Sequence, residues 1–194
     1  KRYRQFVERV AAETTSIPGG DAFARAVAAY LFKLMAYKDE YEVARLHTDG
    51  AFRLKIADAF EGEYKVKFHM APPIFNRGLD EQGRPRKTTF RPWMYGVLSL
   101  MRRFRFLRGT PLDLFGATGE RKLERKLIAD YRARIDSLLP RLNARNMEAA
   151  VAIARLPDDI RGYGPVKLES IEKAEAKLGD LMRQFEEASA ASAA

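Results

Sequence analysis

The chain has 194 residues, a length that suits one domain, and 46% of them are hydrophobic, which is enough for a buried core. It contains 35 Lys and Arg against 26 Asp and Glu, so its net charge of +9 favours an acidic partner: nucleic acid, a membrane surface, an acidic protein or an anionic ligand. It has no cysteine, which excludes disulfides and a thiol nucleophile within the chain and fits a cytoplasmic location.

No apolar run approaches the ~20 residues of a membrane-spanning helix, and no signal peptide is recognisable, so no membrane partner is expected. The chain opens on Lys1 within an expected helix and without an initiator Met. We therefore interpret it as a fragment of a longer protein.

Most of the chain shows helical periodicity, which predicts a mainly α fold. An apolar face predicts a helix over residues 2–13, and Pro18-Gly19-Gly20 ends it. Asp21 is the expected N-cap of a helix from about residue 22 to residue 37, whose nearly continuous apolar content predicts the most buried helix. A further helical segment is predicted over residues 39–47.

One stretch has the period of a β-strand instead. Apolar and basic residues alternate there, which predicts a half-buried strand or hairpin near residues 62–71, ended by Pro72 and Pro73. Because a lone strand leaves its backbone groups unsatisfied, it needs a partner strand in this chain or in a neighbouring part of the protein. The apolar members are Tyr64, Val66, Phe68 and Met70, and the basic ones are Lys65, Lys67 and His69.

Residues 51–60 carry two competing patterns. Every second residue from Phe52 to Ile56 is apolar, as in a strand that pairs with residues 63–70. Apolar residues also recur four apart from Phe52 to Phe60, as on a helix. Because the run Ala-Asp-Ala in this stretch forms strands poorly, we favour the helix and leave the strand open.

Residues 76–92 are rich in glycine, proline and charge, which predicts a long polar loop of the kind that often binds a partner.

Pro92 is expected to start the next helix, and Phe104 at its end is expected in the core. A short capped helical turn is predicted over residues 110–116. The apolar stripe of the helix after Pro92 consists of Trp93, Val97, Leu100, Met101 and Phe104.

Two long amphipathic helices are predicted in the C-terminal part of the chain. Thr118 is expected to cap the first, and the second carries an apolar stripe from Ile171 to Phe185. Together these elements predict a single α-rich domain over residues 1–187, followed by a frayed tail over residues 188–194.

Basic residues gather in several clusters. Cations recur four apart near the start of the helix after Thr118, where like charges repel and the positive helix end disfavours them. Either an acidic partner or local pairing, such as Arg121 with Glu124, explains this arrangement. The other clusters are Arg84, Arg86, Lys87 and Arg91 in the predicted loop, and Arg102, Arg103, Arg105 and Arg108 on the next helix.

No residue pattern points to catalysis, cofactor binding or a metal. The two histidines, His47 and His69, form no His-x-x-x-His or Glu-x-x-His pattern. The serines lie in no nucleophile-elbow context, and acidic neighbours such as Asp39-Glu40 diverge by about a hundred degrees on a helix. Gly162-Tyr163-Gly164 lacks the spacing of a phosphate loop and a preceding strand, so we interpret it as a turn before a helix.

Five stretches together resemble one family. They are Tyr30 to Leu46, Lys67 to Pro73, Gly83 to Lys87 with Phe90 and Pro92 to Met94, Leu107 to Asp113, and Ile160 to Lys167. In order and spacing they look like the C-terminal domain of fused indolepyruvate ferredoxin oxidoreductases, in the 2-oxoacid:acceptor oxidoreductase superfamily. No single motif is diagnostic, but the match covers nearly the whole chain. Pro165 stands where that family is expected to have His, so any role of that His is missing here.

The resemblance implies a parent enzyme that oxidatively decarboxylates aryl pyruvates to acyl-CoA with thiamine diphosphate and Mg, and passes electrons through [4Fe-4S] clusters to ferredoxin. This chain lacks both the Gly-Asp-Gly…Asn pattern for the magnesium diphosphate and any cysteine for a cluster. These cofactors are therefore expected elsewhere in the parent, and the chain alone is not expected to be catalytic.

The expected role is a structural and docking domain of that multidomain enzyme, with the parent's other domains, a second subunit or ferredoxin as partners. The candidate docking residues are Arg84, Arg86, Lys87, Arg102, Arg103, Arg105 and His69, which present positive charge or lie on the polar face of the predicted strand. An alternative stays open: an independent basic helical module that binds nucleic acid or another polyanion, although no nucleic-acid motif is recognisable.

Overall fold

The computed structural model describes residues 1–70, 78, 86–110, 112–113 and 115–190. Within them helices predominate beside one two-stranded sheet, so the predicted mainly α fold with a small β element is confirmed. In chain order the elements are α1 (Arg2–Thr14), α2 (Gly20–Met35), α3 (Glu40–Thr48), α4 (Gly50–Ala59), β1 (Phe68–Met70), β2 (Thr88–Phe90), α5 (Met94–Arg103), η2 (Phe104–Leu107), α6 (Gly119–Leu138), η3 (Leu139–Arg141), α7 (Met147–Arg155), η4 (Leu156–Asp158) and α8 (Pro165–Ala190).

The chain divides into two compact units, where the sequence analysis expects a single domain over residues 1–187. The first unit combines residues 1–37 with the residues from 123 onward, and the second is the continuous segment 38–122. Each unit has an apolar cluster of its own. No Gly- or Ser-rich linker marks either boundary, which is why composition alone does not reveal the division.

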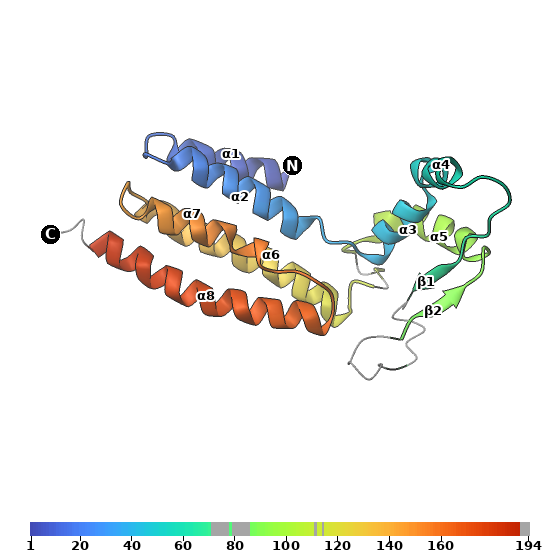
Figure 1. Cartoon of the computed structure of the whole chain (residues 1–194). Coiled ribbons are helices and arrows are strands. Elements are labelled where there is room, and N and C mark those ends of the chain that lie inside the picture. The colour runs from blue at the N-terminus through green and yellow to red at the C-terminus, as the bar shows by residue number, and fades with distance from the viewer. Residues whose placement is uncertain (71–77, 79–85, 111, 114, 191–194) are drawn as a thin grey trace. The chain divides into compact units, whose positions relative to one another are not determined.

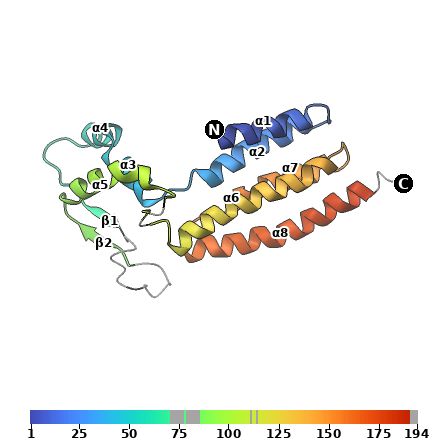
Figure 2. The same cartoon turned by 180° about the vertical axis from the view of Figure 1, so that it is seen from behind.

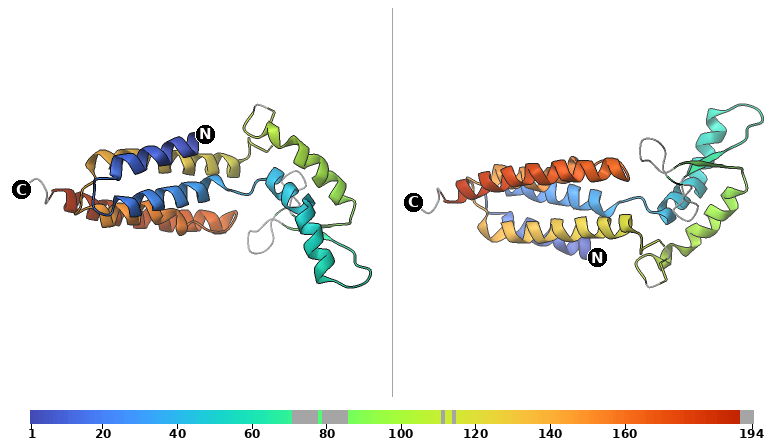
Figure 3. Two further views of the ribbon diagram at one scale, coloured as in Figure 1. Left: turned by 90° about the horizontal axis from the view of Figure 1, so that it is seen from above. Right: turned by 90° about the horizontal axis from the view of Figure 1, so that it is seen from below.

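The first unit is a bundle in which α1, α2, α6, α7 and α8 lie along one another (Figures 1, 2 and 3). Helix α2 contributes heavily to its interior, as its continuous apolar content predicts, and Phe23, Val27 and Leu31 are fully buried. The predicted stripe of α6 also faces inward, through Tyr131 and Ile135. Packing of these apolar faces is what stabilises helices of this length in water.

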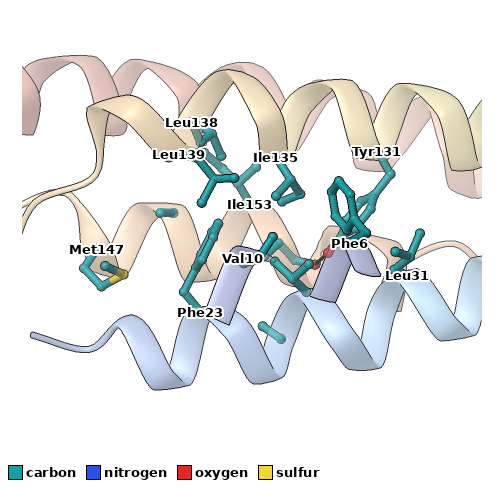
Figure 4. Packing of buried hydrophobic residues seen from close by; sticks show 14 of the residues in the cluster. Phe6, Val10, Phe23, Leu31, Tyr131, Ile135, Leu138, Leu139, Met147 and Ile153 are labelled. Carbon is teal, nitrogen blue, oxygen red and sulfur yellow. Dashed lines mark hydrogen bonds between the residues drawn. The ribbon is translucent and has the colours of Figure 1, made fainter. Parts of the chain in front are cut away.

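Figure 4 shows the centre of this bundle, where side chains of α1, α2, α6 and α7 meet. The ring of Tyr131 lies in this core, and its hydroxyl donates a hydrogen bond to the Ala154 carbonyl oxygen at 2.9 Å. Burial raises the pKa of Tyr131, so the hydroxyl remains a protonated donor. The labelled core residues are Phe6, Val10, Phe23, Leu31, Tyr131, Ile135, Leu138, Leu139, Met147 and Ile153.

Where the turn after α1 meets α2, Gly19 and Gly20 are packed too closely for a side chain at either position. Helix α2 begins at Gly20 with Gly19 as its N-cap, not after a cap by Asp21 as predicted. Gly19 has a left-handed φ of 82°, and a Cβ on Gly20 would lie 2.0 Å from the Thr14 carbonyl oxygen. Asp21 instead lies in the first turn, where its charge suits the positive helix end and pairs with Arg25.

Helix α8 begins at Pro165, directly after a turn in which Gly162 and Gly164 have left-handed φ values of 87° and 54°. This glycine pair therefore serves the helix start, as the sequence predicts, and proline is well suited to a first helical position because its missing N–H would have no intrahelical partner.

The apolar stripe predicted for the last helix packs into the first unit. Its buried members are Ile171, Ala174 and Phe185. Helix α8 continues to Ala190, so residues 188–190 of the predicted frayed tail are helical, and residues 191–194 lie outside the described residues.

The second unit is built around α3, α5 and the β1–β2 hairpin. The two strands pair antiparallel, with Phe68 opposite Phe90 and His69 opposite Thr89. One face of the hairpin packs with the helices, because Phe68 is buried together with Ala44, Met94 and Leu98.

The predicted strand is shorter than its sequence pattern. The ladder covers Phe68–Met70 only, and its partner β2 lies inside residues 76–92, where a long polar loop was predicted. The loop prediction is wrong for Thr88–Phe90, because a run of only three strand-forming residues is hidden among charges and glycines. Residues 71–77 and 79–85, including Pro72 and Pro73, lie outside the described part of the chain.

The helix favoured for residues 51–60 is confirmed as α4. Asp49 caps it by accepting a hydrogen bond from the Phe52 backbone N–H at 3.1 Å. No residue of α4 is buried, which is unusual for a helix with several large apolar side chains.

No helix among the described residues combines the length and apolar character that a membrane span requires.

Candidate interaction surface

Two of the arginines predicted to dock a partner, Arg102 in α5 and Arg105 in η2, interact with residues of α3. The Arg102 guanidinium donates a hydrogen bond to the Thr48 carbonyl oxygen at the C-terminal end of α3, at 3.1 Å. The pKa of Glu42 is lowered, mainly by the hydrogen bond from Arg45 and less by the nearby charge of Arg105. Part of the positive charge predicted to meet a partner is therefore engaged within the unit.

Asp39 anchors the start of α3 from a buried position, with only 4% of its side chain exposed. One carboxylate oxygen accepts the N-cap hydrogen bond from the Glu42 N–H at 2.8 Å. The other lies 2.5 Å from the Arg108 Nε. The buried carboxylate is thus satisfied by a backbone donor and a cation, and this pair ties α3 to the segment after α5.

The segment predicted as a short capped helix is a turn organised by Asp113. Four donors converge on its carboxylate. They are the backbone N–H groups of Gly109, Phe115 and Gly116, at 2.8, 3.2 and 3.0 Å, and the Tyr41 hydroxyl, at 3.3 Å. Burial by itself would raise the pKa of Asp113, but these hydrogen bonds outweigh it and hold the pKa below its ordinary value.

The cations at the start of α6 meet carboxylates of their own chain. Arg121 has a side chain only 10% exposed and donates to the Glu40 carboxylate at 3.3 and 3.4 Å. Glu124, the alternative partner suggested by the sequence, instead accepts from Lys167 at 2.6 Å. Arg121 is therefore paired with a carboxylate of its own chain, though with the distant Glu40 and not with the local partner that the sequence suggested.

The hairpin carries three of the remaining candidate docking residues. His69 lies on the exposed face of β1, where its Nδ1 is 3.0 Å from the Thr89 Oγ1. Arg86 and Lys87 are exposed immediately before β2. The fourth, Arg84, lies outside the described residues.

Four of the five residues in the apolar stripe predicted on α5 are exposed, and only Met101 packs against the core. Met94 and Leu98 are buried instead, because α5 has two apolar faces about 100° apart and only one can meet the rest of the unit. Phe104 was expected in the core but is 41% exposed, so that expectation is wrong. The exposed side chains along α5 and η2 are Trp93, Val97, Leu100, Phe104 and Phe106, beside the exposed Arg103.

A groove of ≈ 870 Å³ opens beside α4, and sequence reasoning missed it. Arg53 and Lys65 supply the cations of its lining. The available signal was the double pattern of residues 51–60, which holds more apolar residues than one buried helix face requires. Its apolar lining includes Phe52, Ile56, Tyr64, Val66, Phe68 and Tyr95.

His47 contacts two residues of the groove lining, Phe52 and Phe68. Its ring meets Phe52 and Phe68 edge to face, with centroids 5.3 and 5.7 Å apart. Its Nδ1 is buried without a hydrogen-bond partner among the described residues. The ring therefore packs against these two residues mainly as an aromatic surface.

A model of a protein family of unknown function, DUF6537, matches residues 1–180 of the chain. The chain belongs to this family. No curated protein and no solved structure matches it.

The described part of this DUF6537 chain contains no group of three or more His, Cys, Asp or Glu side chains that would hold a metal ion. On its surface, exposed apolar side chains occur together with exposed cations. Two parts of that surface are distinct: the α5 stripe, defined by Trp93, Val97, Leu100, Phe104 and Phe106, and the α4 groove.

Proposed function

We propose that this chain is a structural and docking domain of a multidomain, thiamine-diphosphate-dependent indolepyruvate ferredoxin oxidoreductase. The proposed parent is cytoplasmic, oxidatively decarboxylates aryl pyruvates to acyl-CoA and passes electrons to ferredoxin. Within it, the second unit of this chain binds another domain, a second subunit or ferredoxin.

Two contacts join separate stretches of the resemblance within the second unit. Asp39, in the first stretch, pairs with Arg108, in the fourth. Tyr41, from the same first stretch, donates to Asp113 of the fourth. They show that the first and fourth stretches pack together, while the proposed link to the family rests on the order and spacing of the motifs in the sequence.

The uncovered surface of the second unit is the observation that carries the docking role. This unit has seventeen Lys and Arg against eleven Asp and Glu, a net charge of +6. Its α5 stripe exposes Trp93 and Phe106, which are 59% and 70% accessible, and Arg103 at the end of α5 is exposed as well. Large exposed aromatic groups next to arginine are typical of protein–protein interfaces.

The cofactors of the proposed parent do not fit this chain. A [4Fe-4S] cluster needs cysteine ligands, and the chain has none. The described residues also provide no cluster of carboxylates for magnesium. We therefore assign no cofactor contact and no chemical step to these residues.

The test compares the full-length parent with a form that lacks residues 1–194, after both are checked for folding and cofactor content. Aryl-pyruvate-dependent reduction is followed with ferredoxin and with a small dye. A docking domain for ferredoxin predicts normal dye reduction but lost ferredoxin reduction in the truncated form. Equal rates with both acceptors, in an enzyme whose domains and subunits stay associated, contradict the proposal.

A matched pair of variants localises the effect in the full-length parent. Arg103→Glu reverses a charge beside the α5 stripe and should weaken coupling to an acidic partner. Lys173→Glu reverses an exposed charge on α8, in the other unit, and should leave the rates unchanged.

A second candidate function is binding of nucleic acid or another polyanion. It is favoured by Phe104 and Phe106, which are exposed between arginines as in surfaces that stack on single-stranded bases. Binding to a single-stranded oligonucleotide that weakens steeply with salt, and that is lost in Phe106→Ala, would support this function over the first.

A further inference from the structure

The strand pattern continues beyond the paired part of the hairpin. Residues 63–67 lead directly into β1 but have no partner strand. The alternation of the sequence persists there, because Val66 is half-buried between the exposed Lys65 and Lys67. Residues 63–66 make no backbone hydrogen bond to another described residue. Their N–H and C=O groups are therefore open to a strand from another chain.

The α4 groove runs beside this open segment. Tyr64, Val66 and Phe68 line one side, and Phe52 and Ile56 of α4 line another. An open edge flanked by apolar pockets is the arrangement used in strand addition, where main-chain bonds give affinity and pockets accept alternate side chains.

The groove is too open for a small ligand alone. Leu54 and Tyr64 line the groove, yet they are 65% and 47% exposed. A small ligand would be expected to bury most of its own surface in an enclosed cavity. A peptide segment that lies along residues 63–67 would cover more of these side chains.

The positive charge of the groove indicates that a peptide bound there would be acidic. Lys55 and Lys67 flank its lining cations, and neither they nor Lys65 form an ion pair with a described carboxylate. The Arg53 guanidinium lies 5.4 Å from the centre of the Tyr95 ring, which holds its charge at the groove. A second copy of this chain would bring the same cations together, whereas an acidic segment would neutralise them.

We propose that residues 63–67 are a docking strand, to which an acidic segment of a partner protein with apolar residues at alternate positions adds as a further strand. The apolar side chains of that segment fill the α4 groove, and its carboxylates pair with Lys65, Lys67 and Arg53. This inference rests on the docking role proposed above and deepens it by naming the chemistry of the bound segment.

The probe is a labelled peptide of about twelve residues in which Glu and Val alternate, titrated with this chain by fluorescence anisotropy. Two matched peptides test the pattern and the charge: one with the same residues in helical order, and one with Lys in place of Glu. Vesicles containing phosphatidylserine test a membrane surface as the occupant. Only the alternating acidic peptide is expected to bind, with an affinity that falls as salt is added.

Variants of the chain test where on its surface the peptide binds. Val66→Pro removes a backbone donor of the docking strand, and Lys65→Glu reverses a charge of the groove lining; each should weaken binding about tenfold or more. Lys173→Glu, which reverses an exposed charge on α8 in the other unit, should leave this binding unchanged. Equal affinity of all variants, stronger binding of the helical or the basic peptide, or binding to the vesicles alone overturns the proposal.

Hydrogen exchange supplies a readout of the backbone itself. The amides of residues 63–67 should exchange rapidly in the free chain and slow down when the alternating peptide is bound. Unchanged exchange with bound peptide, or protection that requires only a higher concentration of the chain, overturns strand addition. If strand addition is overturned in this way, the docking role proposed for the whole chain can still hold. The truncation assay of the parent tests that role separately, because it measures docking through any part of the chain.

Discussion

The Arg108 guanidinium lies 2.5 Å from the buried carboxylate of Asp39, although most of the second unit separates the two residues in sequence. The same carboxylate caps α3 through the Glu42 N–H. One side chain therefore performs two tasks, which are to begin a helix and to close the segment 38–108 on itself.

Asp39→Ala should destabilise the second unit by about 1–3 kcal/mol, because it removes an N-cap and leaves Arg108 without this carboxylate. The loss is moderate because the Arg108 side chain is 40% exposed, so water replaces part of its interaction with Asp39. The fluorescence of Trp93, the chain's one tryptophan, reports this unit in a urea titration. Asp58→Ala removes an exposed carboxylate of α4 in the same unit and serves as the control; an equally small effect of both would contradict the anchoring role.

The Asp113 turn should give the second unit a specific dependence on pH. Its folded-state pKa lies below the ordinary value of 3.8, so its contribution to stability is present above that value and is lost as pH falls through the folded pKa. Asp113→Asn should therefore be less stable than the natural chain near neutral pH, and the difference should shrink below about pH 3.8. A difference that stays constant through acid would contradict this assignment.

Tyr131→Phe tests the hydrogen bond inside the bundle. Loss of the hydroxyl leaves the buried Ala154 carbonyl without this donor, which should cost about 1–2 kcal/mol of unfolding free energy. Thermal unfolding followed by helix circular dichroism measures it. Tyr163→Phe removes an exposed hydroxyl and should be neutral, so equal melting temperatures of the two variants would show that the buried bond has no net value.

Two glycine-to-alanine variants should differ sharply. At Gly20 a Cβ would lie 2.0 Å from the Thr14 carbonyl oxygen, so Gly20→Ala should destabilise the first unit by about 1–3 kcal/mol. At Gly50, the first residue of α4, nothing lies within 4 Å of the added atom, and the change should be neutral or stabilise by up to about 1 kcal/mol. A similar cost at both positions, measured by urea unfolding, would contradict the close packing of the first turn.

Much of the helical content was predictable because burial in the first unit follows the 3.6-residue period. The stripes of α6 and α8 are examples, in which the residues spaced three and four apart are those that the bundle covers. Helix starts were less predictable. Gly20 shows why, since close packing against Thr14 decided the start of α2 and not the capping preference of Asp21.

The interaction surface was predicted only in part, because charge and apolar patterns do not identify the partner of a side chain. Arg102 belongs to a basic cluster in the sequence, yet its guanidinium donates to the Thr48 carbonyl oxygen at the end of α3. Phe104 fits a core stripe but lies on the second, uncovered face of α5. Which of two apolar faces is buried depends on contacts with distant segments, and no local pattern encodes that choice.

The most direct test of the docking role is hydroxyl-radical footprinting of exposed side chains, in this chain alone and in the full-length parent with its partners. Trp93 and Phe106 on the α5 stripe should be oxidised readily in the isolated chain and protected in the parent, whereas Tyr163 in the first unit serves as an exposed reference within the isolated chain. Equal oxidation of Trp93 and Phe106 in both samples would contradict the claim that the second unit provides a docking surface.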